Sequence, residues 1–283
     1  MKQVILLTTG DCENLSLGRS LKRYFPSAEF VALKRDSFTS TRIPITPPPP
    51  RPRGLSSVVD RFAQMMVAST DPGRDGVAPD LVLAVDDVEL VNLDQIGAVT
   101  GLLRDAIKRH LDTHTWSSMR RKEQTAERLR GHCSFHLLCP MVEAYFFGEP
   151  QALVRAGARI ASTIDPAARD VEDFLTDDTS FLVVPDGKNY WAKTDRKKHP
   201  KRYLQYLVEP EGTNEQPYRE TEGGARALGD LDWARVLTNP NHTSLARSLF
   251  ADLADALGVD NPFPGPCHPL TSRPGIHRVL RNL

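Results

Sequence analysis

The sequence predicts an α/β protein with a mainly parallel sheet flanked by helices and a helical C-terminal part. Three short apolar runs, residues 3–8, 81–87 and 134–140, are typical of strands buried on both faces. Between them lie segments whose apolar residues recur at helical spacing. This alternation predicts parallel strands joined by right-handed crossovers.

The first strand is followed by a helix, because Leu15, Leu17 and Leu21 lie close to helical spacing. Residues 28–33 then predict a second strand. The proline run in residues 43–54 forbids a helix and favours an extended polyproline II segment. A surface spacer is the favoured interpretation of that run, and a partner-binding segment is the alternative. Residues 55–68 read as a helix.

The strand at residues 81–87 precedes a helix with apolar spacing up to Leu111. The highly charged residues 117–130 indicate a solvated helix or a mobile connection. After the strand at 134–140 we expect short helices. Beyond residue 161 the pattern loosens into small strands or turns, and two later helices are expected, from about 197 and from about 244 to Gly258.

Composition is that of an ordinary globular protein, with 40% hydrophobic and 25% charged residues. Four cysteines are too few for a disulfide framework in 283 residues. A bilayer-spanning run needs roughly 20 apolar residues and none occurs, and the N-terminus lacks a signal-peptide layout, so we expect a cytoplasmic protein without membrane contact. The net charge of +0 predicts no global attraction to nucleic acid, although local patches remain open. We expect an α/β core over 1–160 and a helical extension over 161–283 packed on it.

Acidic residues follow three of the predicted strands: Glu13, then Asp86, Asp87 and Glu89, then Glu143. The carboxyl ends of parallel strands share one edge of a sheet, so these acids are expected to converge. Converging carboxylates repel one another unless a cation or protonation neutralises them. Oxygen-only ligands suit Mg²⁺ or Mn²⁺. Singly, Asp86 could be a helix cap, Glu13 a solvated first-turn acid and Glu89 a surface residue.

Four segments also carry a resemblance to a known family: ILLTTGDCENLSLGRSL, LVLAVDDVEL, HLLCPMVEAYFFGEP and HPKRYLQYL. Together they resemble a bacterial family of uncharacterised function related to the TOPRIM domain, which has a Rossmann-like fold. In the TOPRIM fold a glutamate follows the first strand and a DxD-type acidic pair follows a later one. These acids bind Mg²⁺ for phosphodiester chemistry.

The resemblance implies roles for individual residues. Glu13 would be a ligand or a general acid/base, Asp86 and Asp87 would be metal ligands, and Glu143 matches an acidic residue after the next core strand. The acids here read DDVE, so strict DxD spacing is met only by Asp87 and Glu89. Members of this family look like companions of ABC-type or AAA-type ATPases in bacterial defence loci, which implies such a partner.

Other metal or catalytic motifs are weaker. His132, Cys133, His136 and Cys139 invite a zinc site, but alternation along a strand sends them to opposite faces, where they cannot complete a tetrahedron. Buried core cysteines and a packed core histidine are the better interpretation. The GGARALG segment lacks the Walker lysine, which argues against an NTPase. The sequence has no nucleophile-elbow motif, which argues against a Ser-His-Asp hydrolase.

A basic stretch surrounds the motif HPKRYL. It contains Lys193, Arg196, Lys197, Lys198, Lys201 and Arg202 among the aromatic residues Tyr190, Trp191, Tyr203 and Tyr206. Such a patch would neutralise phosphates while aromatic rings stack on bases. An equally good interpretation is a solvated basic surface with its aromatic side chains turned inward.

Two hypotheses follow. The first is an Mg²⁺-dependent (or Mn²⁺-dependent) TOPRIM-like nuclease that acts on DNA or RNA. Its catalytic residues would be Glu13, Asp86 and Glu143, its metal ligands Glu13, Asp86 and Asp87, and its nucleic-acid contacts Lys198, Lys201 and Arg202. The second is a non-catalytic interaction or regulatory subunit with a degenerate site, which binds an ATPase or a DNA-bound partner. The irregular acidic spacing and the proline run favour the second.

Overall fold

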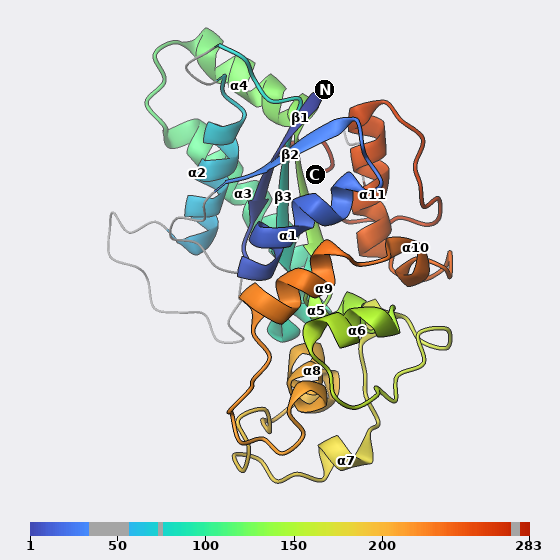
Figure 1. The fold of residues 1–283 in the computed structure, drawn as a ribbon. Coiled ribbons are helices and arrows are strands. Elements are labelled where there is room, and N and C mark those ends of the chain that lie inside the picture. The colour runs from blue at the N-terminus through green and yellow to red at the C-terminus, as the bar shows by residue number, and fades with distance from the viewer. Residues whose placement is uncertain (34–56, 73–75, 273–277) are drawn as a thin grey trace.

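A four-stranded parallel sheet forms the centre of the protein. The computed structural model describes residues 1–33, 57–72, 76–272 and 278–283 (Figure 1). Within these ranges the strand order is β2–β1–β3–β4 and every pairing is parallel. The strands are β1 (Lys2–Thr8), β2 (Ala28–Ala32), β3 (Leu81–Asp87) and β4 (Cys133–Leu138). The predicted α/β class with a parallel sheet is confirmed.

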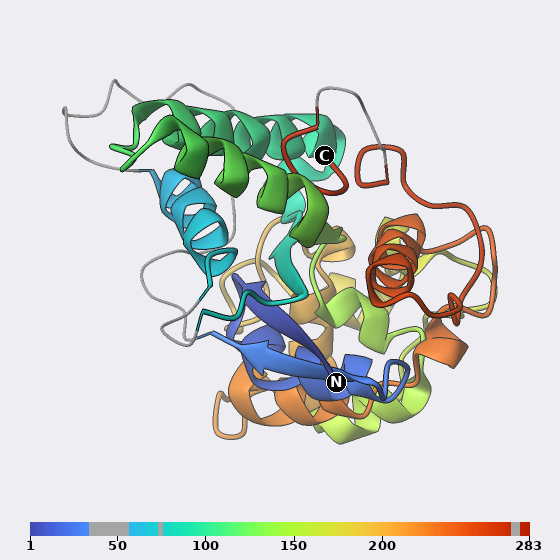
Figure 2. The same cartoon turned by 90° about the horizontal axis from the view of Figure 1, so that it is seen from above.

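Helices flank the sheet on both faces (Figures 1 and 2). The α-helices are α1 (Asp11–Lys22), α2 (Val58–Ser69), α3 (Ile96–Thr113), α4 (Met119–His132), α5 (Glu143–Phe146), α6 (Pro150–Ala156), α7 (Thr179–Leu182), α8 (Pro200–Val208), α9 (Ala225–Gly229), α10 (Trp233–Val236) and α11 (Ser244–Leu257). Three short 3₁₀ turns, η1 (Leu90–Gln95), η2 (Val171–Asp173) and η3 (Arg196–Lys198), and a π-helical turn, η4 (Glu220–Gly224), connect them.

The sheet separates two hydrophobic cores, and β3 contributes to both by alternation. Leu81, Leu83 and Val85 pack in the core on the α1 side. Val82 and Ala84 pack in the core that contains the buried residues of α2 and α3. Asp87 therefore continues the first row of side chains, and its neighbour Asp86 continues the second.

The ends of β3 and β4 lie level with each other, and β1 ends two residues before them. Thr8 at the end of β1 pairs with Val85, and Asp87 at the end of β3 pairs with Leu138 at the end of β4. The segments that leave these ends turn towards the body formed by α5, α6, α8 and α9 in the lower part of Figure 1. Those segments carry the acids that the sequence singles out.

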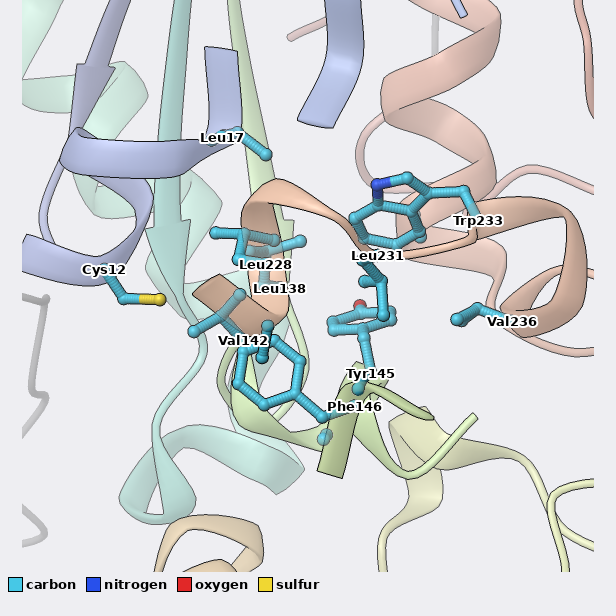
Figure 3. Packing of buried hydrophobic residues seen from close by; sticks show 14 of the residues in the cluster. Cys12, Leu17, Leu138, Val142, Tyr145, Phe146, Leu228, Leu231, Trp233 and Val236 are labelled. Atoms are coloured by element: carbon cyan, nitrogen blue, oxygen red, sulfur yellow. The ribbon is translucent and has the colours of Figure 1, made fainter. Parts of the chain in front are cut away.

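Residues from both sides of position 160 share the core on the α1 side. Figure 3 shows Leu17, Leu138 and Tyr145 gathered with Leu228 and Trp233 of the later helices. The indole N–H of Trp233 donates to the Ser20 hydroxyl at 2.8 Å, which ties α10 to α1. The C-terminal residues are thus packed directly on the α/β layer.

The structure differs from the expectations in the second half of the chain. Residues 170–194 were expected as small strands or turns; they form turns together with η2 and α7, and no strand occurs there in the described structure. The helical turns between Glu220 and Val236 had no counterpart in the prediction. The charged stretch is a regular helix, α4, and α11 ends at Gly258 as predicted. The proline run lies outside the described residues.

Within the described ranges, every helix is too short or too polar to traverse a lipid bilayer.

Candidate active site at the carboxyl ends of the strands

A pocket of about 170 Å³ lies beyond the carboxyl ends of β1, β3 and β4. It is lined by Glu13, Asp87, Glu89, Met141, Val142, Glu143, His199, Lys201, Arg202 and Glu220. Three acidic positions that are distant in sequence therefore meet at one edge of the sheet, as the sequence predicts. The lining contains five carboxylic acids and, apart from His199, two basic side chains.

Glu13 projects from the first turn of α1 and is only 3% exposed. A side chain at Gly10 would collide with the carboxylate of Glu13, so this glycine provides the space that the carboxylate occupies. Burial raises the pKa of Glu13 to about 8, and the neighbouring acid Glu143 contributes to the rise.

Asp87 and Glu89 approach the pocket from the end of β3. The backbone N–H of Val142 donates to Oδ1 of Asp87 at 3.2 Å, which fixes this carboxylate beside α5. Burial, followed by the charges of Glu13 and Glu143, raises the pKa of Asp87 well above its usual value. Glu89 has a φ of 66°, in the left-handed region, and its N–H donates to the carbonyl of Pro140 at 2.8 Å.

Glu143 is the first residue of α5 and is 2% exposed. The hydroxyl of Tyr218 donates to its Oε1 at 3.2 Å, and Nζ of Lys201 lies 3.8 Å from the same oxygen. Burial raises the pKa of Glu143, while the Lys201 ammonium opposes the rise. A buried acid in this position needs a cation or a proton close by.

Lys201 supplies that cation from the first turn of α8. Its ammonium forms an ion pair with Glu220 and lies beside Glu143, and its side chain is 29% exposed. Burial alone lowers the pKa of Lys201, but the carboxylates of Glu143 and Glu220 outweigh it and raise the pKa above its ordinary value. The lysine therefore carries its charge within the pocket.

The structure does not bring Asp86 into this group. Adjacent strand residues point to opposite faces, so Asp86 lies on the side of Val82 and Ala84, away from the pocket lining. It is 1% exposed, and its Oδ1 accepts a hydrogen bond from the Thr9 hydroxyl at 2.6 Å. The geometry assigns the pocket to Asp87 and Glu89, the two acids that have DxD-type spacing.

The basic stretch divides in the structure. Lys201 and Arg202 line the pocket, whereas Lys198 is exposed and lies outside its lining. The guanidinium of Arg202 donates to Oε1 of Gln205 at 2.8 Å. Trp191, Tyr203 and Tyr206 are buried, so these aromatic side chains turn inward, as one of the two interpretations expected.

Sequence reasoning missed Glu220, which lines the pocket, and Tyr218, whose hydroxyl donates to Glu143. Both residues come from the segment leading into α9. Side chains at Gly223 and Gly224 would collide with the carbonyl of Ala156 and the hydroxyl of Tyr218 respectively. Only glycines allow η4 to approach α6 and Tyr218 this closely. The Gly-Gly pair was the signal that this turn is held in close packing.

The zinc alternative finds no support in the geometry. His136 is fully buried, and its Nε2 lies 3.1 Å from Oδ2 of Asp252 on α11. Cys133 and Cys139 are buried free thiols in the core beside α2 and α3. The packed core histidine and the core cysteines are thus confirmed.

The donor set suits Mg²⁺ or Mn²⁺ in kind, because Glu13, Asp87 and Glu143 offer only carboxylate oxygens. The positions of these carboxylates in the structure, however, are not those of a formed metal site. Across the described parts of the chain, no group of three or more His, Cys, Asp or Glu side chains is arranged so that it could hold a metal ion. The cation that lies among these carboxylates is the ammonium of Lys201.

No family model, no curated protein and no solved structure matches this chain. The function of this protein is therefore inferred from the chemistry of the pocket residues.

Proposed function

We propose that this protein is a metal-dependent nuclease of TOPRIM-like type, with Mg²⁺ or Mn²⁺ held by Glu13, Asp87 and Glu143. The observation that carries the proposal is the meeting of these carboxylates, from the ends of three strands, in one small pocket. The proposal replaces Asp86 by Asp87 as the ligand from β3. Glu89, two residues further on, completes the acidic pair that the resemblance implies.

The side chains around the pocket divide the chemistry between them. A bound Mg²⁺ would supply Lewis-acid polarisation of the phosphate and a lowered pKa for the attacking water. Without a metal ion the pKa of Glu13 is about 8, so its carboxyl group holds a proton at neutral pH that a bound ion would displace. Lys201 and Arg202 offer cationic groups for the phosphate oxygens. Glu143 serves as an additional ligand or as the base.

The substrate proposed is nucleic acid, and both DNA and RNA present the phosphodiester that this chemistry needs. The proposed partner is an ABC-type or AAA-type ATPase in bacterial anti-phage defence, and the proposed location is the cytoplasm. These three statements rest on the resemblance and on composition. Co-purification of an ATPase with the tagged protein from its own cells tests the partner.

A second candidate function is a non-catalytic regulatory subunit with a degenerate site. The observation in its favour is the ion pairing of Lys201 with the pocket acids, together with the lack of a ready metal geometry in the described residues. Thermal shift with Mn²⁺ separates the two. An occupied site stabilises the protein in proportion to the logarithm of ion excess, whereas a degenerate site leaves the melting temperature unchanged.

Two neighbouring aspartates provide a matched test. Asp87→Asn removes a pocket carboxylate, and Asp86→Asn makes the same chemical change on the opposite face of β3. Cleavage of DNA and RNA substrates is measured with Mg²⁺ and with EDTA. We expect Asp87→Asn to lower the Mg²⁺-dependent rate at least about 100-fold, in the range for loss of a charge-stabilising group, and Asp86→Asn to stay near wild type. Equal rates for Asp87→Asn and wild type would refute the site.

A further inference from the structure

We infer that Lys201 is an internal cation that occupies the carboxylate pocket and must leave it before a divalent ion can bind. Nucleic acid would then promote metal binding, because a substrate phosphate draws the ammonium away from the carboxylates. This inference rests on the proposed function, since it assigns a regulation to the proposed metal site.

Lys201 places a positive charge inside the carboxylate pocket. Its Nζ lies 3.8 Å from Oε1 of Glu143 and is paired with Glu220 on the other side. Glu13 and Asp87 line the same pocket and interact with the ammonium more weakly, through its charge. Of the three proposed ligands, Glu143 is therefore the one in direct range of the lysine.

Simultaneous occupancy by Lys201 and a metal ion is unfavourable. Mg²⁺ binds carboxylate oxygens at about 2.0–2.1 Å, so an ion on Glu143 would lie within a few ångströms of the ammonium. Glu13 and Glu143 are 3% and 2% exposed, and water therefore screens this repulsion poorly. The ammonium and a metal ion therefore compete for Glu143.

The structure also gives Lys201 a route outwards. Its outer partner, Glu220, is 37% exposed, whereas its inner partner, Glu143, is 3% exposed by side chain. The lysine stem is unbranched and flexible, so the ammonium can exchange Glu143 for a group at the pocket mouth without movement of α8. A phosphate of bound nucleic acid, next to Arg202, is an anion that would stabilise the ammonium in this outer position.

Reciprocity makes the inference measurable. If phosphate binding releases the carboxylates, nucleic acid must tighten Mn²⁺ binding by the same factor by which Mn²⁺ tightens nucleic-acid binding. Removal of the lysine should produce the released state permanently. A variant without Lys201 should therefore bind Mn²⁺ more tightly than wild type and lose the effect of nucleic acid.

The test is calorimetric titration of Mn²⁺ into wild type, Lys201→Met and Lys108→Met, each with and without a phosphorothioate oligonucleotide that resists cleavage. Lys108→Met is the matched control, since it removes the same charge from an exposed position on α3, outside the pocket lining. We expect Lys201→Met to bind Mn²⁺ roughly 5- to 150-fold more tightly, the usual range of coupling between two sites. The oligonucleotide should tighten Mn²⁺ binding in wild type and Lys108→Met only.

The outcomes separate this inference from the proposed function. Equal or weaker Mn²⁺ binding by Lys201→Met, while wild type binds Mn²⁺ and cleaves, overturns the inference and leaves the nuclease standing. Absence of Mn²⁺ binding and of cleavage in all three proteins overturns the nuclease and the inference with it. If circular dichroism shows that Lys201→Met does not fold, Lys201→Gln, which retains a polar head, takes its place in the same titrations.

Discussion

Two buried glutamates in this protein have similar burial and opposite surroundings. Glu172 is 7% exposed and accepts hydrogen bonds from the N–H groups of Leu245 and Ala246, at 3.0 and 2.9 Å, and from the hydroxyl of Tyr145 at 2.8 Å. Glu13 is 3% exposed, but its electrostatic neighbours include the acids Glu143 and Glu220. Hydrogen-bond donors dominate the surroundings of Glu172, and other carboxylates dominate those of Glu13.

Burial raises the pKa of both groups, to about 7 for Glu172 and about 8 for Glu13. At Glu172 the backbone hydrogen bonds work against that rise, whereas at Glu13 the charge of Glu143 adds to it. Glu172 therefore contributes to stability by satisfying the start of α11. The buried carboxylates of the strand-end pocket lower the stability of the folded protein. Such a cost is typical of residues retained for chemistry rather than for folding.

The largest expected effect is at the structural glutamate. Glu172→Ala leaves two N–H groups and the hydroxyl of Tyr145 without their acceptor in a buried position. We expect the free energy of unfolding to fall by about 3 kcal/mol. Urea denaturation measures it, and Glu172→Gln, which keeps one acceptor oxygen, should lose less. A loss of unfolding free energy below about 1 kcal/mol would show that Glu172 does not stabilise the fold in the way that distinguishes it from the pocket acids.

Glu13→Gln should act in the opposite direction in the presence of EDTA. Between the unfolded pKa of 4.5 and the folded pKa of about 8, the folded wild type holds a proton that the unfolded chain has lost. Wild-type stability therefore declines as pH rises through this window. Gln has no such proton, so the stability of the variant should rise relative to that of wild type by about 2 kcal/mol between pH 6 and 8. Parallel stability curves would contradict this.

The smallest expected effect concerns the exposed lysine. Lys198→Ala should leave folding unchanged and weaken oligonucleotide binding slightly, with the salt-dependence slope reduced by about 0.7–0.9 for one phosphate contact. Fluorescence anisotropy over a range of salt concentrations measures this slope. An unchanged slope would remove Lys198 from the proposed nucleic-acid contacts and confine them to Lys201 and Arg202.

The sequence predicted the sheet and the long helices because their apolar residues repeat with a clear period. Residues 81–87 and 244–258 illustrate this, since both elements appear where the pattern placed them. Helices of four or five residues, such as α9 and α10, are too short to show a period. The position of α9 follows from packing against α1 and α6, and that of α10 from its contact with α1. The local sequence does not encode these tertiary contacts.

The site was predictable in outline, because strand topology brings Glu13, Asp87 and Glu143 to one edge. The choice between Asp86 and Asp87 was harder, since every residue of β3 before them is apolar and does not tell which face meets α1. The DxD-type spacing of Asp87 and Glu89 was the feature of the sequence that favoured Asp87 over Asp86. Glu220 arrives from more than 70 residues after Glu143 through the packing of η4, so no strand-end argument reaches it.

The proposed site requires one metal ion to be shared by Glu13, Asp87 and Glu143. A crystal structure with Mn²⁺ and a phosphorothioate oligonucleotide, analysed by anomalous diffraction, is the sharpest test. We expect one anomalous peak in contact with all three carboxylates, and the ammonium of Lys201 moved to a phosphate oxygen. A crystal that shows Lys201 still paired with Glu143, and the manganese peak elsewhere or missing, would contradict it.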